Sequence, residues 1–362
     1  MRTRVLLCLA VAALAVRGDP PTERAHSATP ATWVWHLDPR LAELTAPTYR
    51  DLLGAIPKDA SILVCVEHAR EVLPYRGLLE LGDGRIRLVE TGVPLSAWAR
   101  DRYVLFTRDR SSCVLVPQTA SVRAPWRGDL EVPRRLCKRF PGLRLIETRL
   151  AFEGGNLLVT DDHVIVGESV LLDSRAAFDG DDAAVIAELE RTFARRALVI
   201  GDSSTSAPHG HVDMFLSTVD PRTLLLGDPS LTLEYFDARD SLGIESPDVR
   251  GVGSFRRSTQ IHYARVYARI AAQLEAEGFE VKRIPILHGD DGDDVITWNN
   301  AVIEKRGGQL HAYVPNYGIP LLDRKANECW RRAGAEVCPI RADLVILEGG
   351  AVRCLSNVFP QE

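Results

Sequence analysis

The sequence predicts a mixed α/β fold in a single domain, because two element types alternate and no linker interrupts them. From about residue 31 to the C-terminus, short apolar runs typical of strands alternate with segments of helical periodicity. No shift in composition marks a domain boundary, and 362 residues with 46% hydrophobic content provide ample material for a core. Alternation of this kind is typical of helices packed against a sheet.

Each predicted strand is an apolar run bounded by turn residues. The predicted strands cover residues 61–66, 85–89, 103–106, 113–116, 143–147, 163–166, 198–200, 224–226, 280–284, 295–303 and 344–347. Helices are predicted over residues 183–195, 259–277 and 321–332, and the first has apolar residues at positions 185, 186, 189 and 193.

The N-terminus has the pattern of a secretory signal. Arg2 and Arg4 precede an apolar run over residues 5–16, and Ala-Leu-Ala at 13–15 offers a cleavage site. The run is too short for a comfortable membrane span. We therefore expect a signal peptide over residues 1–18, a Pro-, Thr- and Ser-rich flexible leader over 19–30, and a secreted or periplasmic mature protein without a membrane anchor.

Charge and cysteine content narrow the function classes. A net charge of −5 without a Lys/Arg block argues against a nucleic-acid partner. Six cysteines follow the leader, and an oxidising compartment favours pairing them. Cys329 and Cys338 bracket the end of a helix and the start of a strand, so a disulfide between them is a candidate. Cys65 lies within an apolar run and is expected to be a buried small side chain.

Cys354 is the candidate nucleophile. It closes the run Leu-Glu-Gly-Gly-Ala-Val-Arg-Cys, which is interpreted as a buried strand leading through two glycines to a thiol. Upstream, His211 and Asp213 are expected on one face of a strand, directed into a common site. With His209 they also form His-x-His-x-Asp, a zinc-site pattern, but Met214 stands where the metallohydrolase version has another His.

Two further polar motifs and one acidic run stand out. Arg-Asp at 100–101 enters an apolar strand, and Glu-Gly-Gly-Asn at 153–156 joins a carboxylate to glycines that permit close backbone approach. The pattern apolar-Glu-Gly-Gly recurs about 195 residues later, ending at Gly349 and Gly350, which fits a repeat of roughly 65 residues. The acidic run at 290–294 is interpreted as a solvated loop, and the alternatives are a calcium site or a segment that attracts a cationic substrate.

Taken in order, these motifs resemble the guanidino-group-modifying (pentein) superfamily, in the branch of agmatine deiminases and bacterial peptidyl-arginine deiminases. The resemblance runs from about residue 90 to 360 and includes a Trp-Asn-Asn stretch at 298–300 and Tyr-Val-Pro-Asn-Tyr-Gly-Ile-Pro at 313–320. It implies a five-bladed, pseudo-symmetric α/β-propeller over residues 31–362. It also implies a cationic guanidino small molecule or an arginine-containing peptide as substrate, and no metal or organic cofactor.

The resemblance assigns a role to each motif residue. Cys354 becomes the nucleophile, His211 the general acid and base, and Asp101 and Asp213 the carboxylates that hold the guanidinium nitrogens. Glu153 supports both His211 and the substrate. Asn156, Trp98 and Asn299 complete the predicted substrate-binding set. The chemistry is consistent, because a guanidinium needs carboxylates that match its planar donors and a strong nucleophile for its central carbon.

The sequence leaves the substrate and two other functions open. Arg102, Tyr103 and Val104 follow Asp101 where this branch commonly has Gly-Pro, and the region before residue 90 lacks the Trp-rich opening of agmatine deiminases. An amidinotransferase would use the same thiol chemistry with an amine in place of water. A non-catalytic binding protein on this scaffold would have its cysteines paired.

Overall fold

The computed structural model describes residues 31–82, 84–109, 111–118, 127–201, 207–242, 252–291 and 294–359. The expected signal peptide and leader, residues 1–30, lie outside these ranges, so both stay predictions. In the described part of the chain, no helix is long and apolar enough to cross a membrane.

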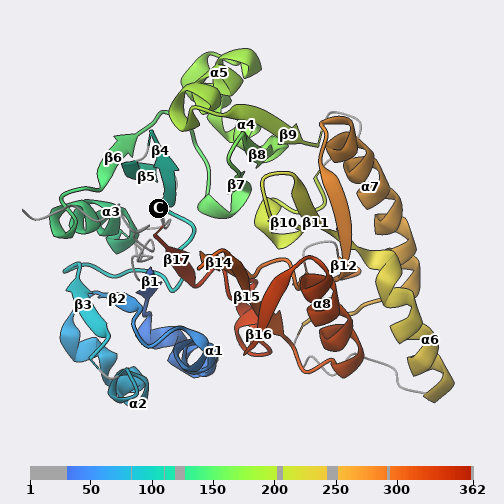
Figure 1. The fold of residues 1–362 in the computed structure, drawn as a ribbon, viewed down its shortest axis with the longest axis horizontal. Helices are drawn as coiled ribbons and strands as arrows, with labels where there is room; N and C mark the ends of the chain where they lie inside the picture. Colours follow the sequence, from blue (N-terminus) through green and yellow to red (C-terminus); the bar gives the residue numbers. More distant parts are fainter. Residues whose placement is uncertain are drawn as a thin grey trace, which may run out of the picture.

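Five small sheets surround a common centre, and helices lie towards the periphery (Figure 1). The first sheet consists of β4 (Val104–Arg108), β5 (Ser111–Val116) and β6 (Arg144–Glu147), and the second of β7 (Leu157–Val159), β8 (His163–Gly167) and β9 (Arg196–Ile200). The third consists of β10 (Leu216–Thr218), β11 (Thr223–Asp228), β12 (Glu280–His288) and β13 (Val295–Thr297). The fourth consists of β14 (Val302–Arg306), β15 (Gln309–Asn316) and β16 (Ala335–Arg341). The fifth joins the C-terminal β17 (Ser356–Val358) to β1 (Thr32–His36), β2 (Ser61–Val66) and β3 (Ile86–Glu90).

Every sheet repeats one pairing pattern. Its first strand is antiparallel to the second, and the second is parallel to the third. Parallel neighbours require a crossover, which helices supply. The helices are α1 (Ala42–Ala55), α2 (Arg76–Glu80), α3 (Gly128–Arg139), α4 (Glu168–Ser174), α5 (Asp182–Phe193), α6 (Leu233–Leu242), α7 (Arg257–Ala276) and α8 (Pro320–Arg332). The expectation of a five-bladed α/β-propeller is confirmed.

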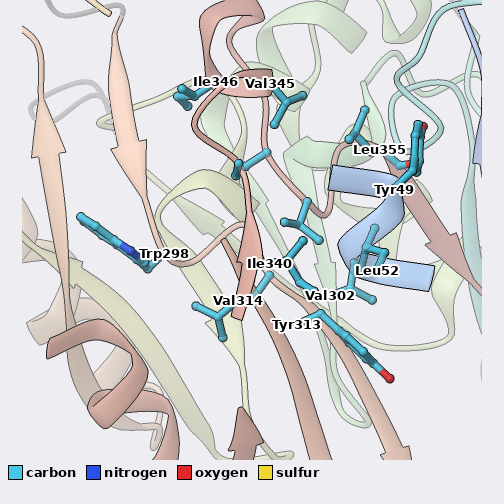
Figure 2. Close-up of a cluster of buried hydrophobic side chains, with 14 of the residues drawn as sticks. Tyr49, Leu52, Trp298, Val302, Tyr313, Val314, Ile340, Val345, Ile346 and Leu355 are labelled. Atoms are coloured by element: carbon cyan, nitrogen blue, oxygen red, sulfur yellow. The ribbon is translucent and has the colours of Figure 1, made fainter. Parts of the chain in front are cut away.

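The two ends of the described chain close the ring. Strand β17 pairs with β1, so the last strand completes the blade that the first strand begins. Apolar side chains beneath this closure come from α1, β14, β15, β16 and the segment before β17, as Figure 2 shows for Tyr49, Leu52, Val302, Tyr313, Val314, Ile340, Val345, Ile346 and Leu355. The hydroxyl of Tyr49 also donates to the carbonyl oxygen of His36 at 2.7 Å.

Most predicted elements are confirmed, but two predicted strands are wrong. The run over 295–303 is split into β13 and β14, because the carbonyl of Trp298 accepts from the indole of Trp330 and that of Asn299 accepts from Ser217. The run over 344–347 is a 3-10 turn, Val345–Glu348. The amides of Ile346 and Leu347 donate to the carbonyls of Ala342 and Leu344, so these two amides are not available to a strand ladder.

Candidate active site

The candidate site residues stand just before the first strands of the five blades. Asp101 precedes β4, Glu153 precedes β7, Asp213 precedes β10, Asn300 precedes β14 and Cys354 precedes β17. Because each of these strands is the first of its blade, the pseudo-symmetric fold brings five distant chain segments to one end of the ring. Hydrogen bonds between the segments join them into one site.

Cys354 is buried and held through its backbone. Its amide donates to Oδ1 of Asn300 at 3.2 Å, and the same oxygen accepts from the Arg353 amide at 3.0 Å. Burial raises the pKa of the Cys354 thiol above its ordinary value, and the carboxylates of Asp213 and Asp101 raise it further. In these surroundings, Cys354 is therefore a neutral thiol.

His211 lies next to a 3-10 turn, Val212–Met214, as its N-terminal cap, and not on the strand that we expected. The amide of Met214 donates to the carbonyl of His211 at 3.2 Å, a short-range turn contact that a strand cannot make. Although Asp213 is thus not on a shared strand face with His211, the structure does bring the two side chains into one site.

An ion pair holds the His211 ring. Its Nε2 donates to Oε2 of Glu153 at 2.8 Å, and Oε1 of Glu153 accepts from Nη1 of Arg102 at 2.6 Å. Burial lowers the pKa of His211, but the hydrogen bond with Glu153 and the charges of Asp101 and Asp213 outweigh it and raise the pKa to about 9. The imidazole is therefore protonated at neutral pH.

The two aspartates of the site differ in their partners. Asp213 is fully buried, and its two oxygens accept from Nε of Arg353 at 3.0 Å and Nδ2 of Asn300 at 3.3 Å. Asp101 is only partly buried, and its carboxylate has no hydrogen bond to the described residues. Burial raises the pKa of Asp101 to about 7, with Glu153 and Asp213 adding to the effect and His211 opposing it. Asp101 is thus the carboxylate available to a cation.

The glycine pair lets the backbone approach the site closely. A Cβ on Gly154 would collide with the carbonyl oxygen of Arg100. A Cβ on Gly155 would lie 2.5 Å from Nδ1 of His211 and 3.1 Å from Oδ1 of Asp213. The glycines of the Glu-Gly-Gly motif are therefore required because a side chain has no room at either position. Backbone conformation does not require them, since neither has a positive φ.

We expect Gly155→Ala to destabilise the protein by about 1–3 kcal/mol, because an added methyl group must displace the His211 ring. Gly54→Ala is the matched control: Gly54 lies in helix α1, and an added methyl group there would meet nothing within 4 Å. There, alanine should be neutral or stabilise by about 0.5–1 kcal/mol. Urea unfolding of both variants measures the difference, and equal stabilities would contradict the close approach at Gly155.

Three predicted substrate-binding residues have structural partners. Asn156 accepts from the Glu153 amide at 3.0 Å and donates to the Gly210 carbonyl at 3.1 Å, which ties the Glu153 turn to the His211 loop. Asn299 donates to the carbonyl of Leu225 at 2.8 Å, within its own part of the core. The Trp98 ring packs over Gly350, where an added Cβ would collide with it.

Sequence reasoning missed three residues that organise the site. Asn300, next to the predicted Asn299, bonds the Cys354 amide and Asp213. Arg102 and Arg353 neutralise Glu153 and Asp213. All three are sequence neighbours of predicted residues, so adjacency was the signal that could have found them.

All six cysteines after the leader are free, so the expected Cys329–Cys338 disulfide is wrong. The surroundings of the two thiols differ. Among neighbouring charges, Arg332 on the same helix has the largest effect on the pKa of the Cys329 thiol, and Glu336 on the same strand has the largest effect on that of the Cys338 thiol. Cys65 is fully buried as expected, and burial raises the pKa of its thiol.

Among the residues that the structure describes, no group of three or more His, Cys, Asp or Glu side chains could hold a metal ion. In the His-x-His-x-Asp motif, Nε2 of His211 is bonded to Glu153. In the acidic run, the carboxylate of Asp290 accepts from the hydroxyls of Ser254 and Thr259, while residues 292 and 293 lie outside the described ranges.

The structure is similar to several solved structures. A C. jejuni agmatine deiminase has a TM-score of 0.65 at 13% identity, covering 92% of this chain and 93% of that one. An Enterococcus faecalis agmatine deiminase has 0.62 at 13% identity, with 92% and 93% covered. A Porphyromonas gingivalis protein, provisionally assigned as an arginine deiminase, has 0.66 at 19% identity, with 92% and 96% covered. At these identities the likeness shows the pentein fold.

The sequence comparisons identify the family. No curated protein matches the chain significantly. The family model of the Porphyromonas-type peptidyl-arginine deiminases matches residues 20–241, more than half of the 362 residues. The chain therefore belongs to the Porphyromonas-type peptidyl-arginine deiminase family.

Proposed function

We propose that this protein is a Cys-dependent hydrolase that converts a guanidino group into a ureido group and ammonia. The observation that carries the proposal is the meeting of a buried thiol, a Glu153-bound imidazolium and the unpartnered Asp101 carboxylate at the starts of the inner strands. The family match and a C. jejuni agmatine deiminase described with substrate bound support agmatine or peptidyl-arginine as the type of substrate.

Substrate charge activates the thiol in this mechanism. Burial holds the pKa of Cys354 high, and the carboxylates of Asp213 and Asp101 raise it further. A guanidinium bound against Asp101 brings a positive charge that offsets them, and the thiolate becomes accessible. The nucleophile is thus formed when a cationic substrate is present, which protects the thiol from oxidation in an empty site.

The chemical steps require only side chains and water. The Cys354 thiolate attacks the central guanidinium carbon, and a C–S bond forms to give a tetrahedral adduct. His211 gives a proton to one nitrogen, the C–N bond breaks, and ammonia leaves a thiouronium on Cys354. Neutral His211 then accepts a proton from water, whose oxygen attacks the same carbon. The C–S bond breaks and returns the thiolate. The ureido product gives up its hydroxyl proton to the released ammonia, which leaves as ammonium.

The test is a panel of agmatine, free arginine and an arginine-containing peptide, assayed for ammonia and for the ureido group. At least one member should give both products in equal amounts. An added amine acceptor distinguishes hydrolysis from amidino transfer, because transfer would give a new guanidine in place of ammonia and the ureido compound. No turnover of any member would contradict the proposal.

We expect a bell-shaped pH profile of kcat/KM for the responsive substrate. The Asp101 carboxylate, which attracts the cation, is lost as pH falls through about 7, and the His211 acid is lost as pH rises through about 9. In Glu153→Gln, the side chain no longer stabilises the imidazolium, so the alkaline limb should move down by about 1 pH unit or more.

The matched control for that shift is Glu336→Gln. Glu336 lies 3.4 Å from Nδ1 of His311 in another His–Glu pair, outside the candidate site. Its replacement should leave both limbs of the profile in place. An unchanged alkaline limb in Glu153→Gln would remove His211 from the acid role.

We also propose that the mature protein is secreted or periplasmic, on the signal-peptide pattern of residues 1–18. N-terminal sequencing of the protein recovered outside the cytoplasm should give a start after that segment. Recovery of the uncleaved chain from the cytoplasm alone would contradict this location.

A further inference from the structure

A cavity lies at the opposite ends of the inner strands from Cys354. It has a volume of about 520 Å³ and is lined by residues at or beyond the ends of β7 and β10, together with β14 and the turn that follows it. Its lining includes Thr160, Thr218, Val219, Lys305 and Arg353. Of these, Arg353 alone also contacts the candidate active site, through Asp213.

The Arg353 guanidinium contacts the candidate active site and also lines the cavity. Its Nε donates to Asp213 at 3.0 Å, while its two terminal nitrogens have no hydrogen bond to the described residues. The same side chain lines an adjoining cavity of about 180 Å³ together with the buried Arg100. Two guanidinium groups therefore lie near a shared space, and burial, followed by Arg353, lowers the pKa of Arg100 to about 9.

The other charges around the larger cavity leave its inner end positive. Lys305 is exposed and has no ion pair among the described residues. The carboxylate of Asp220 accepts from the amides of Arg222 and Thr223, both at 2.8 Å, so its negative charge is already compensated locally. Asp161 is exposed. A ligand that reaches Arg353 therefore meets two terminal guanidinium nitrogens that are free to donate hydrogen bonds.

We propose that this cavity binds a small carboxylate, held by the terminal nitrogens of Arg353 with Lys305 attracting it from the rim. A guanidinium offers two parallel N–H groups that match the two oxygens of a carboxylate. The free nitrogens of Arg353, the exposed charge of Lys305 and the volume of the cavity all fit such a ligand.

The site has a consequence for catalysis, and this part rests on the proposed function. A carboxylate on Arg353 shares the cation that otherwise neutralises Asp213, so the active site becomes more negative. A cationic guanidino substrate should then bind more tightly, and its KM should fall about fivefold at saturating ligand.

The test is isothermal titration of the whole protein with acetate, using methylammonium as the probe of opposite charge at equal ionic strength. Acetate should show saturable binding. Methylammonium can reach the Asp101 carboxylate, so any binding of it should be the same in the wild type and in Lys305→Gln. Lys305→Gln should weaken acetate binding about 3–10-fold, and Val219→Trp, which fills the cavity, should abolish it. Lys282→Gln is the matched control, since Lys282 lies on β12 beside Glu280 and does not line the cavity.

The outcomes separate the two proposals. No saturable acetate binding, or equal binding by the Lys305→Gln and Lys282→Gln variants, would overturn the carboxylate site. If Val219→Trp fails to fold, the lysine pair still decides. Because titration does not depend on turnover, acetate binding by a protein that turns over no guanidine would retain the cavity and reject the proposed function.

Discussion

Cys354→Ala is expected to lose turnover of the responsive guanidino substrate by at least about 10³-fold, because alanine removes the atom that forms the covalent bond. The backbone contacts of this residue do not depend on its side chain: its amide still donates to Asn300, and its carbonyl still accepts from the Arg100 amide. The variant should therefore fold and retain the carboxylates of the site, so the loss is assigned to chemistry.

Cys329→Ala is the control for this prediction. Cys329 is another free cysteine, partly buried in helix α8, and it has no contact with the candidate site. Its variant should keep wild-type turnover. The measurement is ammonia release under single-turnover and steady-state conditions, and activity of Cys354→Ala close to that of Cys329→Ala would reject the nucleophile.

Local patterns in the sequence were sufficient for much of the fold. The apolar run at 61–66 coincides with β2, and the apolar face at 183–195 corresponds to α5. Such segments are specified by burial on one face or on both. The closure of the ring between β17 and β1 depends on contacts across the whole chain. Neither strand was predicted, and the resemblance supplied only the five-bladed architecture.

The wrong elements lie next to the site, where turns replace the ladder. Residues 344–347 are as apolar as a strand, but the amides of Ile346 and Leu347 donate to nearby carbonyls in a turn that leads to Gly349, whose φ of 78° favours glycine. Residues 211–214 likewise form a turn. The side-chain pattern of both segments also suits a strand, so apolar periodicity alone does not predict these turns.

The resemblance named the site residues and one pair among them, Glu153 with His211, but not their other partners. Asn299 and Asn300 are both buried and adjacent, and the sequence offers no way to tell which amide faces Cys354. Arg102 stood out as a departure from the family pattern, and the structure gives it a role as the partner of Glu153. Pairings of this kind join residues far apart in the chain, and one sequence does not record them.

Asp101→Asn is expected to lower kcat/KM by about 10²–10³-fold while making the protein more stable. The loss arises because the unpartnered carboxylate that attracts the cationic substrate becomes a neutral amide. The gain arises because the pKa of this carboxyl is raised to about 7, so ionising it opposes folding at any pH above its unfolded value. Removing that charge should therefore raise the midpoint of thermal unfolding at pH 8.

Asp213→Asn, at the other aspartate of the site, should behave oppositely in stability. Asp213 is fully buried and pairs with Arg353, so an amide leaves a guanidinium without its counter-charge, at a cost of about 3–5 kcal/mol. Both variants should lose activity, but only Asp101→Asn should unfold at a higher temperature than the wild type. A fall in stability for both would show that Asp101 is a structural ion-pair partner. Another carboxylate of the site would then have to attract the cationic substrate.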